Sequence, residues 1–480
     1  MSLNSRPSLK IWLVIIAIVV LLAAMLRLPP VWSRVVYHSS EVYRTVKYWL
    51  QPPSEAVFVP STYDDGVVTP SALAGITADV PTPQPTTEPT TIPSQPTPKV
   101  AITVDAPTPQ PTTEPTAIPS QPTPKAIFTP TPAPPPLPST VLLKGISCER
   151  QLMNNCGPTT LSMYLSYYAW GKDQIAAAGV LRPNEKDVNV MPYELVDFVN
   201  EHTALRALWR YGGDLQTIKA LLNAGYPVMI EKSFEPYTLR NEGWMGHYNL
   251  VVGYDDENQN LTVHDSYLMS YPPWGGEIPQ EQWKTFIGFD FSINELEQAW
   301  RSFNFVFIVV YPPEKENDVL NVLGLRATEE EACRIAKERA MQETSSLQDV
   351  RDKFFAWFNA GTSLVCLQDY DTAAAAFDTA FGIYPDIKQV SRPYRLLWYE
   401  TGPYTAYYYS GRYQDVISLA DQTLGNMAEP ALEESYYWRA LSYYALGNKT
   451  RAVADLRTSL EYHPGFAPSV AMLEQLGKTP

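Results

Sequence analysis

The segment QLMNNCGPTT (residues 151–160), followed by LSMYLSYY, is the most informative part of this 480-residue sequence. Its apolar periodicity predicts a helix over residues 158–170, with Pro158 in the first turn, where the missing N–H would have no partner anyway. Cys156 is therefore expected at or just before a helix N-terminus. The helix dipole and the N–H groups at that position favour a thiolate and can stabilise an oxyanion.

A cysteine in this setting is either a small core residue or a reactive thiol. Gln151 lies five residues before Cys156, on the loop that enters the predicted helix, so its side-chain amide can supply a second oxyanion donor. A thiolate nucleophile also requires a base. A histidine able to act as that base would favour a reactive thiol at Cys156 over a core residue.

The globular region that contains Cys156 has three histidines. His202 lies in a polar stretch and is expected at the surface. His247 opens GHYNLVVGYD, at the start of a predicted buried strand, and His264 lies in LTVHDSY on the following strand. An Asp- and Asn-rich turn centred near Asp256 is predicted to join these two strands into a hairpin.

Strand pairing in this hairpin predicts which histidine has a carboxylate partner. A turn centred near Asp256 places residues 247 and 265 opposite each other, because both lie at the same distance from the centre. Cross-strand partners share a face, so His247 and Asp265 are expected on one side and His264 on the other. Asp265 can then orient the imidazole as a base, whereas a histidine without such a partner is more often structural.

Together these motifs resemble peptidase family 39, the papain-like family that includes the double-glycine leader peptidases of bacteriocin exporters. The resemblance rests on the glutamine, on Cys-Gly-Pro at a helix start, on the GHYNLVVGYD segment and on the later aspartate, and it covers residues 141–313. It implies a papain-like α+β fold with Cys156 as nucleophile, His247 as base, Asp265 as orienting acid and Gln151 as oxyanion residue. It implies no metal and no cofactor.

The sequence also departs from the exporter members of that family. Those members continue into a transporter with an ATPase, but this sequence contains no phosphate-binding glycine loop and a single long apolar run. It is more similar to the stand-alone members, so neither bacteriocin export nor cleavage after a double glycine is implied. The resemblance leaves the substrate open.

Residues 314–480 are predicted to be helical and to contain a repeat of about 34 residues, the period of the tetratricopeptide repeat. The first unit carries the residues of that pattern at its spacing, namely Trp357, Gly361, Tyr370, Ala373, Phe377, Ala380 and Pro385. Two weaker units follow, and the wider gap before the second indicates an insertion after the first. A generic helical bundle is the alternative; helical repeats would bind a protein partner or the substrate.

The N-terminal part predicts an anchor and a spacer. Residues 11–26, IWLVIIAIVVLLAAML, form an unbroken apolar run that can cross a bilayer with Arg27 reaching the interface, or alternatively serve as a cleaved signal peptide. PTPQPTTEPTTIPSQPTPK (residues 81–99) recurs from residue 107 with one change. Such Pro/Thr-rich sequence predicts a disordered extended spacer, a docking site for a proline-recognition module being the alternative.

Composition limits the remaining possibilities. The net charge of −15, without a basic run, disfavours binding to nucleic acid or to an anionic membrane surface. Four cysteines are too few for a disulfide scaffold, and none forms a C-x-x-C pair typical of zinc sites. Positive charges flank the apolar run on both sides, so orientation is inferred from the Pro/Thr-rich stalk, which is typical of the extracytoplasmic face.

We therefore expect a single-pass bacterial cell-membrane protein with its globular domains on the extracytoplasmic face. Its predicted segments are a transmembrane anchor (1–30), a juxtamembrane segment (31–59), a disordered linker (60–140), a papain-like cysteine peptidase domain (141–313) and an all-α tetratricopeptide-like domain (314–480). The predicted activity is thiol hydrolysis of peptide or amide bonds in a peptide or protein substrate. A catalytically silent peptide-binding adaptor and a thiol-dependent acyl transferase are the alternatives.

Overall fold

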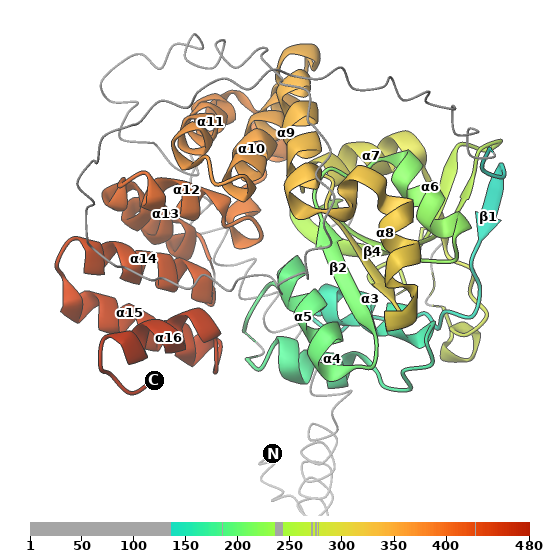
Figure 1. Cartoon of the computed structure of the whole chain (residues 1–480), viewed down its shortest axis with the longest axis horizontal. Coiled ribbons are helices and arrows are strands. Elements are labelled where there is room, and N and C mark those ends of the chain that lie inside the picture. Colours follow the sequence, from blue (N-terminus) through green and yellow to red (C-terminus); the bar gives the residue numbers. More distant parts are fainter. Residues whose placement is uncertain are drawn as a thin grey trace, which may run out of the picture. The chain divides into compact units, whose positions relative to one another are not determined.

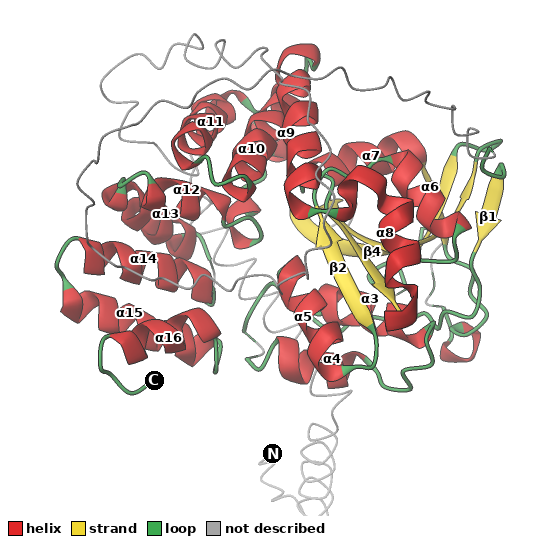
Figure 2. Cartoon of the chain, viewed as in Figure 1, coloured by secondary structure: helices red, strands yellow, loops and turns green. Residues whose placement is uncertain are grey.

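The computed structural model describes residues 136–480 except 185, 236–242, 270–271, 274–275, 277 and 428. The predicted anchor, the juxtamembrane segment and nearly all of the predicted linker lie outside these residues. Within the described part of the chain, no helix is both long and apolar enough to span a membrane. Residues 138–480 fall in one compact unit, which contains a mixed α/β domain followed by a helical region (Figures 1 and 2).

The mixed α/β domain is built on a seven-stranded antiparallel sheet (Figure 2). Its strands are β1 (Thr140–Leu142), β2 (Arg206–Arg210), β3 (Val228–Phe234), β4 (Met245–Asp255), β5 (Asn260–His264), β6 (Phe289–Ser292) and β7 (Phe307–Tyr311). Its helices are α3 (Cys156–Ser166), α4 (Gln174–Leu181), α5 (Pro192–His202), α6 (Leu215–Asn223) and α7 (Ile293–Arg301). The strand order is β2-β7-β3-β4-β5-β6, and β1 pairs with the C-terminal end of β4.

Helices cover both faces of the sheet, which explains why β4 is apolar along most of its length. Helices α3 and α5 form one core with side chains such as Leu250 and Val310. Helices α6, α7 and α8 (Glu316–Leu323) form a second core on the opposite face, with Val251 and Val309. Residues 157–165 of α3 are all buried, and this burial fixes the position of the Cys156 backbone at the helix start.

The β4–β5 hairpin differs in register from the one predicted. Asp255 pairs with Asn260 and Leu250 pairs with His264, so the turn is centred beyond Asp256. The direct pairing of residues 247 and 265 expected from the sequence is therefore wrong. The physical reason is that the turn occupies residues 256–259, between the paired Asp255 and Asn260, and the Asp/Asn-rich composition alone does not specify where such a turn is centred.

A β-bulge nevertheless brings His247 and Asp265 to one face. The register changes by one residue between Val251 and Gly253, because the bulged strand carries one extra residue there. Without the bulge, the register set by Asp255 and Asn260 would continue along both strands and place Asp265 opposite residue 250. Asp265 would then lie on the other face of the hairpin from His247. The predicted shared face is therefore present, but it depends on a bulge that was not predicted.

The helical region begins with α8 (Glu316–Leu323), which covers the sheet, and continues to the C-terminus (Figure 1). The other helices are α9 (Glu329–Ser346), α10 (Val350–Cys366), α11 (Tyr370–Ile383), α12 (Gly402–Tyr409), α13 (Tyr413–Gly425), α14 (Glu433–Ala445), α15 (Lys449–Tyr462) and α16 (Ala467–Gln475). A Cβ on Gly361 of α10 would lie 2.7 Å from the Phe377 ring of α11, so this pair needs glycine for its close approach.

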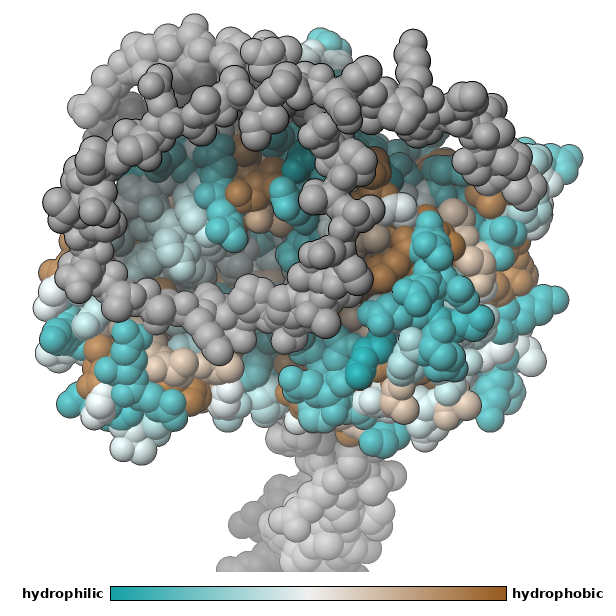
Figure 3. Space-filling view, viewed as in Figure 1, coloured by the Kyte–Doolittle hydropathy of each residue, from teal (hydrophilic) through white to brown (hydrophobic). Residues whose placement is uncertain are grey.

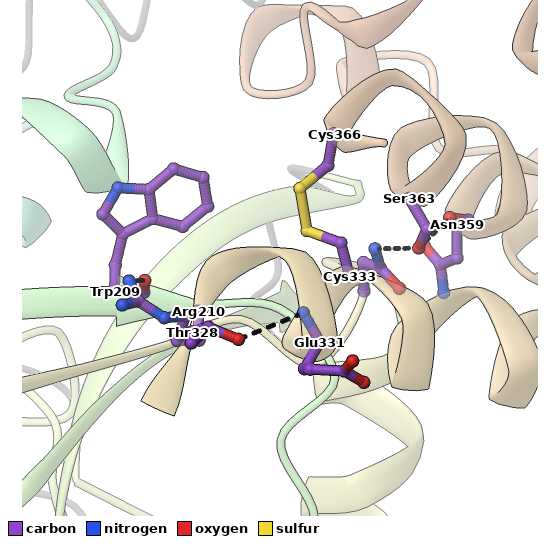
Figure 4. Close-up of a disulfide and its surroundings, with 9 residues drawn as sticks. Trp209, Arg210, Thr328, Glu331, Cys333, Asn359, Ser363 and Cys366 are labelled. Atoms are coloured by element: carbon purple, nitrogen blue, oxygen red, sulfur yellow. Dashed lines mark hydrogen bonds between the residues drawn. A yellow bond between two sulfur atoms is a disulfide. The ribbon is translucent and has the colours of Figure 1, made fainter. Parts of the chain in front are cut away.

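The expected insertion after the first repeat unit takes the form of three short 3-10 helices, Tyr384–Asp386, Gln389–Ser391 and Leu396–Trp398, before α12 begins. The helical region also contains a disulfide between Cys333 on α9 and Cys366 at the end of α10 (Figure 4). The sequence analysis did not predict this bond, because two cysteines 33 residues apart carry no pairing signal.

The surface seen in Figure 3 is largely hydrophilic, with hydrophobic residues scattered in small groups among the polar ones. Such scattered apolar residues are ordinary for a folded domain and mark no binding site by themselves. The features that bear on function lie instead below the surface, at the start of α3 and between the α/β domain and the helical region.

Candidate active site

Cys156 is the first residue of α3, as the Cys-Gly-Pro motif predicts. The preceding Asn155 is buried, and its side chain is held by Gln174 Oε1 (2.8 Å) and by Arg182 Nη1 (3.1 Å) rather than by the helix N-terminus. The backbone N–H groups at the helix start therefore keep their orientation without a capping side chain. Cys156 as a residue is partly exposed, unlike the residues that follow it in α3.

His247 lies near the start of β4, between Cys156 and Asp265. Its Nε2 atom is 2.9 Å from Asp265 Oδ1, and the imidazole is close enough to the Cys156 thiol to lower the pKa of that thiol. Because Nε2 faces the carboxylate, Nδ1 is the nitrogen left for the thiol. The structure thus brings together three of the four residues predicted from the sequence in the order thiol, imidazole, carboxylate.

Asp265 is fully buried, and several donors hold its carboxylate. The backbone N–H groups of Tyr267 and Leu268 donate to Oδ1 at 2.9 and 3.0 Å, and Asn249 Nδ2 donates to Oδ2 at 2.9 Å. The buried Lys232 ammonium adds a favourable charge. Neither Asn249 nor Lys232 was predicted as a site residue, although Asn249 follows His247 by two positions and so shares its face.

These contacts favour a charged thiolate–imidazolium pair. Burial acts to raise the pKa of Cys156, but the hydrogen bond and charge of His247 outweigh it and leave the pKa below the ordinary thiol value. Burial acts to lower the pKa of His247, but Asp265 and Cys156 raise it to about 9. Burial likewise opposes ionisation of Asp265, yet His247 and Lys232 hold its pKa below the ordinary value.

His264 lies apart from this arrangement. It pairs with Leu250 in the sheet, is buried near Phe286, and hydrogen-bonds the backbone of Ile287. Burial lowers its pKa to about 4, so it stays neutral at physiological pH. His202, at the end of α5, is exposed as expected.

Gln151 is anchored beside the same site. Its backbone N–H donates to the carbonyl oxygen of Ser266 at 3.2 Å, and the Ser266 hydroxyl donates to Gln151 Oε1 at 2.7 Å. Because Oε1 accepts this bond, the amide is oriented with Nε2 as the group left to donate. Ser266 directly follows Asp265, so one short segment orients both His247 and Gln151. The role of Ser266 was not predicted from the sequence.

Gly246, directly before His247, makes room for the helical region. A Cβ at this position would lie 2.8 Å from the Tyr399 ring and 2.8 Å from the Phe303 ring. Tyr399 also hydrogen-bonds the Gly246 backbone and is close enough to Cys156 for the two groups to interact electrostatically. Tyr399 directly follows the last of the three 3-10 helices, so the insertion after the first repeat unit reaches the neighbourhood of the nucleophile.

A cavity of about 190 Å³ adjoins this contact. It is lined by the α5 residues Pro192 and Tyr193, by Trp209, Tyr211 and Glu231 from the sheet region, and by Tyr399, Glu400 and Gly402, together with Met191, Val306, Glu329, Thr362, Val365, Cys366, Thr401 and Thr405. Glu231 and Glu400 are both more than nine-tenths buried, and burial raises the pKa of Glu400 to about 8. Tyr399, which lines the cavity, also packs against Gly246, the residue before His247, so the cavity shares one wall with the surroundings of the candidate base.

Comparison with known proteins agrees with this geometry. Residues 143–288 match the family described as "Peptidase_C39 like family", and residues 434–465, which span most of α14 and all of α15, match the tetratricopeptide repeat. No curated protein showed significant similarity to the chain. A crystal structure from Bacillus anthracis, described as a C39-like peptidase, aligns with 17% identity over 36% of this chain and 96% of its own, at a TM-score of 0.27.

The resemblance inferred from the sequence is therefore confirmed: the α/β domain is similar to C39-like peptidases and the helical region contains a tetratricopeptide repeat. The matched repeat is the third of the three units predicted, and the predicted second and third units correspond to the helix pairs α12–α13 and α14–α15. A C39-like domain suggests a papain-like cysteine peptidase or a relative of one.

The lowered pKa of Cys156 gives a direct prediction about alkylation. We expect iodoacetamide to modify Cys156 near pH 7 much faster than Cys148, whose pKa is raised by burial and whose side chain is inaccessible. Substituting His247→Ala should shift the Cys156 rate profile to higher pH, whereas the matched His264→Ala should leave it unchanged. Mass spectrometry of each modified peptide across pH 5–10 measures both effects. Equal profiles for the two variants would show that His247 does not tune the thiol.

Proposed function

We propose that this protein is a membrane-anchored cysteine peptidase whose helical repeats contribute to substrate binding. The observation that carries the proposal is the position of His247, whose Nε2 lies 2.9 Å from Asp265 and whose ring also interacts with the Cys156 thiol. A histidine with a buried carboxylate on one nitrogen and a thiol on the other is the arrangement required to activate a sulfur nucleophile.

The proposed reaction starts from the thiolate–imidazolium pair. The Cys156 sulfur attacks the carbonyl carbon of the scissile amide, and the carbonyl oxygen becomes an oxyanion that the Cys156 N–H and the Gln151 side-chain amide stabilise. The His247 imidazolium gives its proton to the leaving amine, which departs and leaves a thioester. Neutral His247 then takes a proton from water, which attacks the thioester and restores the thiolate. Asp265 keeps the imidazole oriented throughout.

The cavity lined by Tyr399 supports a preference for substrates with a basic side chain. Glu231 and Glu400 line it, and burial keeps the pKa of each carboxyl group above its usual range. A lysine or arginine side chain entering the cavity would stabilise the ionised carboxylates, and the rings of Trp209, Tyr211 and Tyr399 offer cation–π contact. Because Tyr399 and Glu400 belong to the helical region, this region would help to select the substrate.

The proposed location is the extracytoplasmic face of the bacterial membrane. The apolar run of residues 11–26 supports the anchor, and the Pro/Thr-rich repeat supports a spacer that holds the enzyme off the bilayer. The Cys333–Cys366 bond is an independent observation in favour, because disulfides persist mainly in oxidising compartments. The helical repeats would present a further surface to a protein partner.

A panel of irreversible peptidyl inhibitors tests this proposal on the full-length protein. The panel consists of peptidyl chloromethyl ketones that differ in one residue, which is lysine, arginine, leucine or glutamate. This residue is placed in turn at each position before the reactive group. We expect an adduct on Cys156, with the fastest inactivation for a basic side chain. Glu400→Gln should reduce the preference for lysine over leucine, while the exposed Glu281→Gln serves as the control.

The outcomes separate the proposal from its alternatives. A catalytically silent adaptor would bind peptides without forming an adduct at Cys156. An acyl transferase would form the adduct, but turnover of a peptide substrate would give aminolysis products in preference to hydrolysis when an amine acceptor is added. Labelling of Cys156 without any preference for basic side chains would agree with the proposed peptidase activity but contradict the proposed preference for basic substrates.

A further inference from the structure

A second cluster of polar side chains lies where the α/β domain meets the last repeat unit, away from the candidate active site. Asp187, on the segment between α4 and α5, is 1% exposed, and Glu433, the first residue of α14, is 2% exposed. His463 directly follows α15. One carboxylate oxygen of Asp187, one carboxylate oxygen of Glu433 and one ring nitrogen of His463 all lie within 4.8 Å of one another.

Two more carboxyl groups lie against this trio. Glu194 Oε1 is 3.9 Å from His463 Nδ1, and the other oxygen of Glu194 accepts a bond from the Met191 N–H at 2.7 Å. Glu434 is 6% exposed, and its charge acts on the Glu194 carboxyl group. Four acidic side chains and one imidazole are therefore gathered in a space that solvent hardly reaches.

Three carboxylate oxygens of this cluster lack a hydrogen-bond partner among the described residues. Asp187 Oδ2, Glu433 Oε2 and Glu434 Oε2 are buried and make no hydrogen bond within the described part of the chain. A buried carboxylate oxygen without a partner is costly, because it loses its hydration and gains nothing in return. Three such atoms in one cluster favour the binding of a cation between them.

One arginine lies close to the cluster. The Arg182 guanidinium donates to the backbone oxygen of Asp187 at 2.7 Å and to the Asn155 side chain at 3.1 Å. His463 Nδ1 is 2.7 Å from Glu433 Oε1, so the imidazole lies directly against one of the buried carboxyl groups.

We infer that Asp187, Glu433 and His463 bind one divalent metal ion, with Glu194 and Glu434 completing its surroundings. One imidazole with several carboxylates is a ligand set suited to Zn²⁺ or Mn²⁺, whereas Ca²⁺ and Mg²⁺ prefer oxygen ligands alone. The ion would be structural, since Cys156 and His247 belong to a different site. It would join the α/β domain to the last repeat and hold the first turn of α5, whose residues Pro192 and Tyr193 line the cavity.

Metal analysis of the full-length protein tests this inference. The protein is stripped with a chelator and dialysed against ZnCl₂ or MnCl₂, and the bound metal is measured by inductively coupled plasma mass spectrometry. We expect about one ion per chain and a rise in melting temperature on binding. Glu433→Gln and His463→Ala should each weaken the affinity at least about tenfold. Glu461→Gln and His202→Ala, which change exposed side chains, are the matched controls.

Two further measurements keep a folding defect from being mistaken for the expected result. Metal-free Glu433→Gln should melt at or above the temperature of the metal-free parent, because glutamine keeps an oxygen next to His463 and replaces the unpartnered carboxylate oxygen with a group that carries no charge. X-ray absorption of the parent should show oxygen ligands with an imidazole nitrogen. A sulfur ligand would place the ion at Cys156 instead, and an absence of stoichiometric metal would mean that the acids share protons; either result overturns the inference.

Discussion

His247→Ala is expected to lower peptide hydrolysis by at least about 10⁴-fold, to near background, because it removes both the base that activates Cys156 and the acid that protonates the leaving amine. The loss should appear in kcat more than in KM, since the ring acts on the reacting atoms rather than on remote parts of the substrate. The substrate for this assay is a fluorogenic version of whichever peptide best labels Cys156 in the inhibitor panel.

His264→Ala is the matched control for this experiment. It removes an equally buried imidazole one residue from Asp265, but His264 pairs with Leu250 on the opposite face of the hairpin and has its pKa lowered to about 4. We expect a modest loss of stability from the cavity and less than about tenfold loss of activity. Should the two variants exchange their effects, His264 would be the base and the assignment of His247 would be wrong.

The relation between sequence and site is clearest at this hairpin. The choice of His247 over His264 rests on period-two alternation, which the sequence displays directly, and the structure does place His247 Nε2 2.9 Å from Asp265 Oδ1. The register behind that choice was wrong. A bulge between Val251 and Gly253 compensates for a turn centred beyond Asp256, and neither feature leaves a reliable mark in composition.

Features that depend on distant parts of the chain could not be predicted from local pattern. Cys156 at a helix start follows from Cys-Gly-Pro alone. The approach of Tyr399 to Gly246 joins segments far apart in sequence, as does the gathering of Asp187 with Glu433. The wider gap between repeat units did indicate an insertion, but its contact with the α/β domain depends on tertiary packing rather than on any propensity of the inserted residues.

Asp265→Asn is expected to reduce kcat/KM by roughly 10³–10⁴-fold while leaving the backbone in place. Asparagine can keep the bonds from the Tyr267 and Leu268 N–H groups, because its side-chain oxygen can occupy the position of Oδ1. It cannot supply the negative charge that stabilises the His247 imidazolium. The thiolate–imidazolium pair should therefore be less populated at neutral pH, and chemistry should slow even when substrate is bound.

The pH profile distinguishes this loss from a merely structural one. With Asp265 ionised, the pKa of His247 is raised to about 9, so the imidazolium that protonates the leaving amine persists up to that pH and is lost above it. Removing the carboxylate charge should lower that pKa and move the alkaline limit of kcat/KM to lower pH. Asp290→Asn is the matched control, because this exposed aspartate on β6 accepts only a bond from Thr262 at 2.8 Å, and its profile should match the parent. If Asp265→Asn lowered the rate without moving the alkaline limit, the carboxylate would support the fold of the loop but would not set the charge of His247.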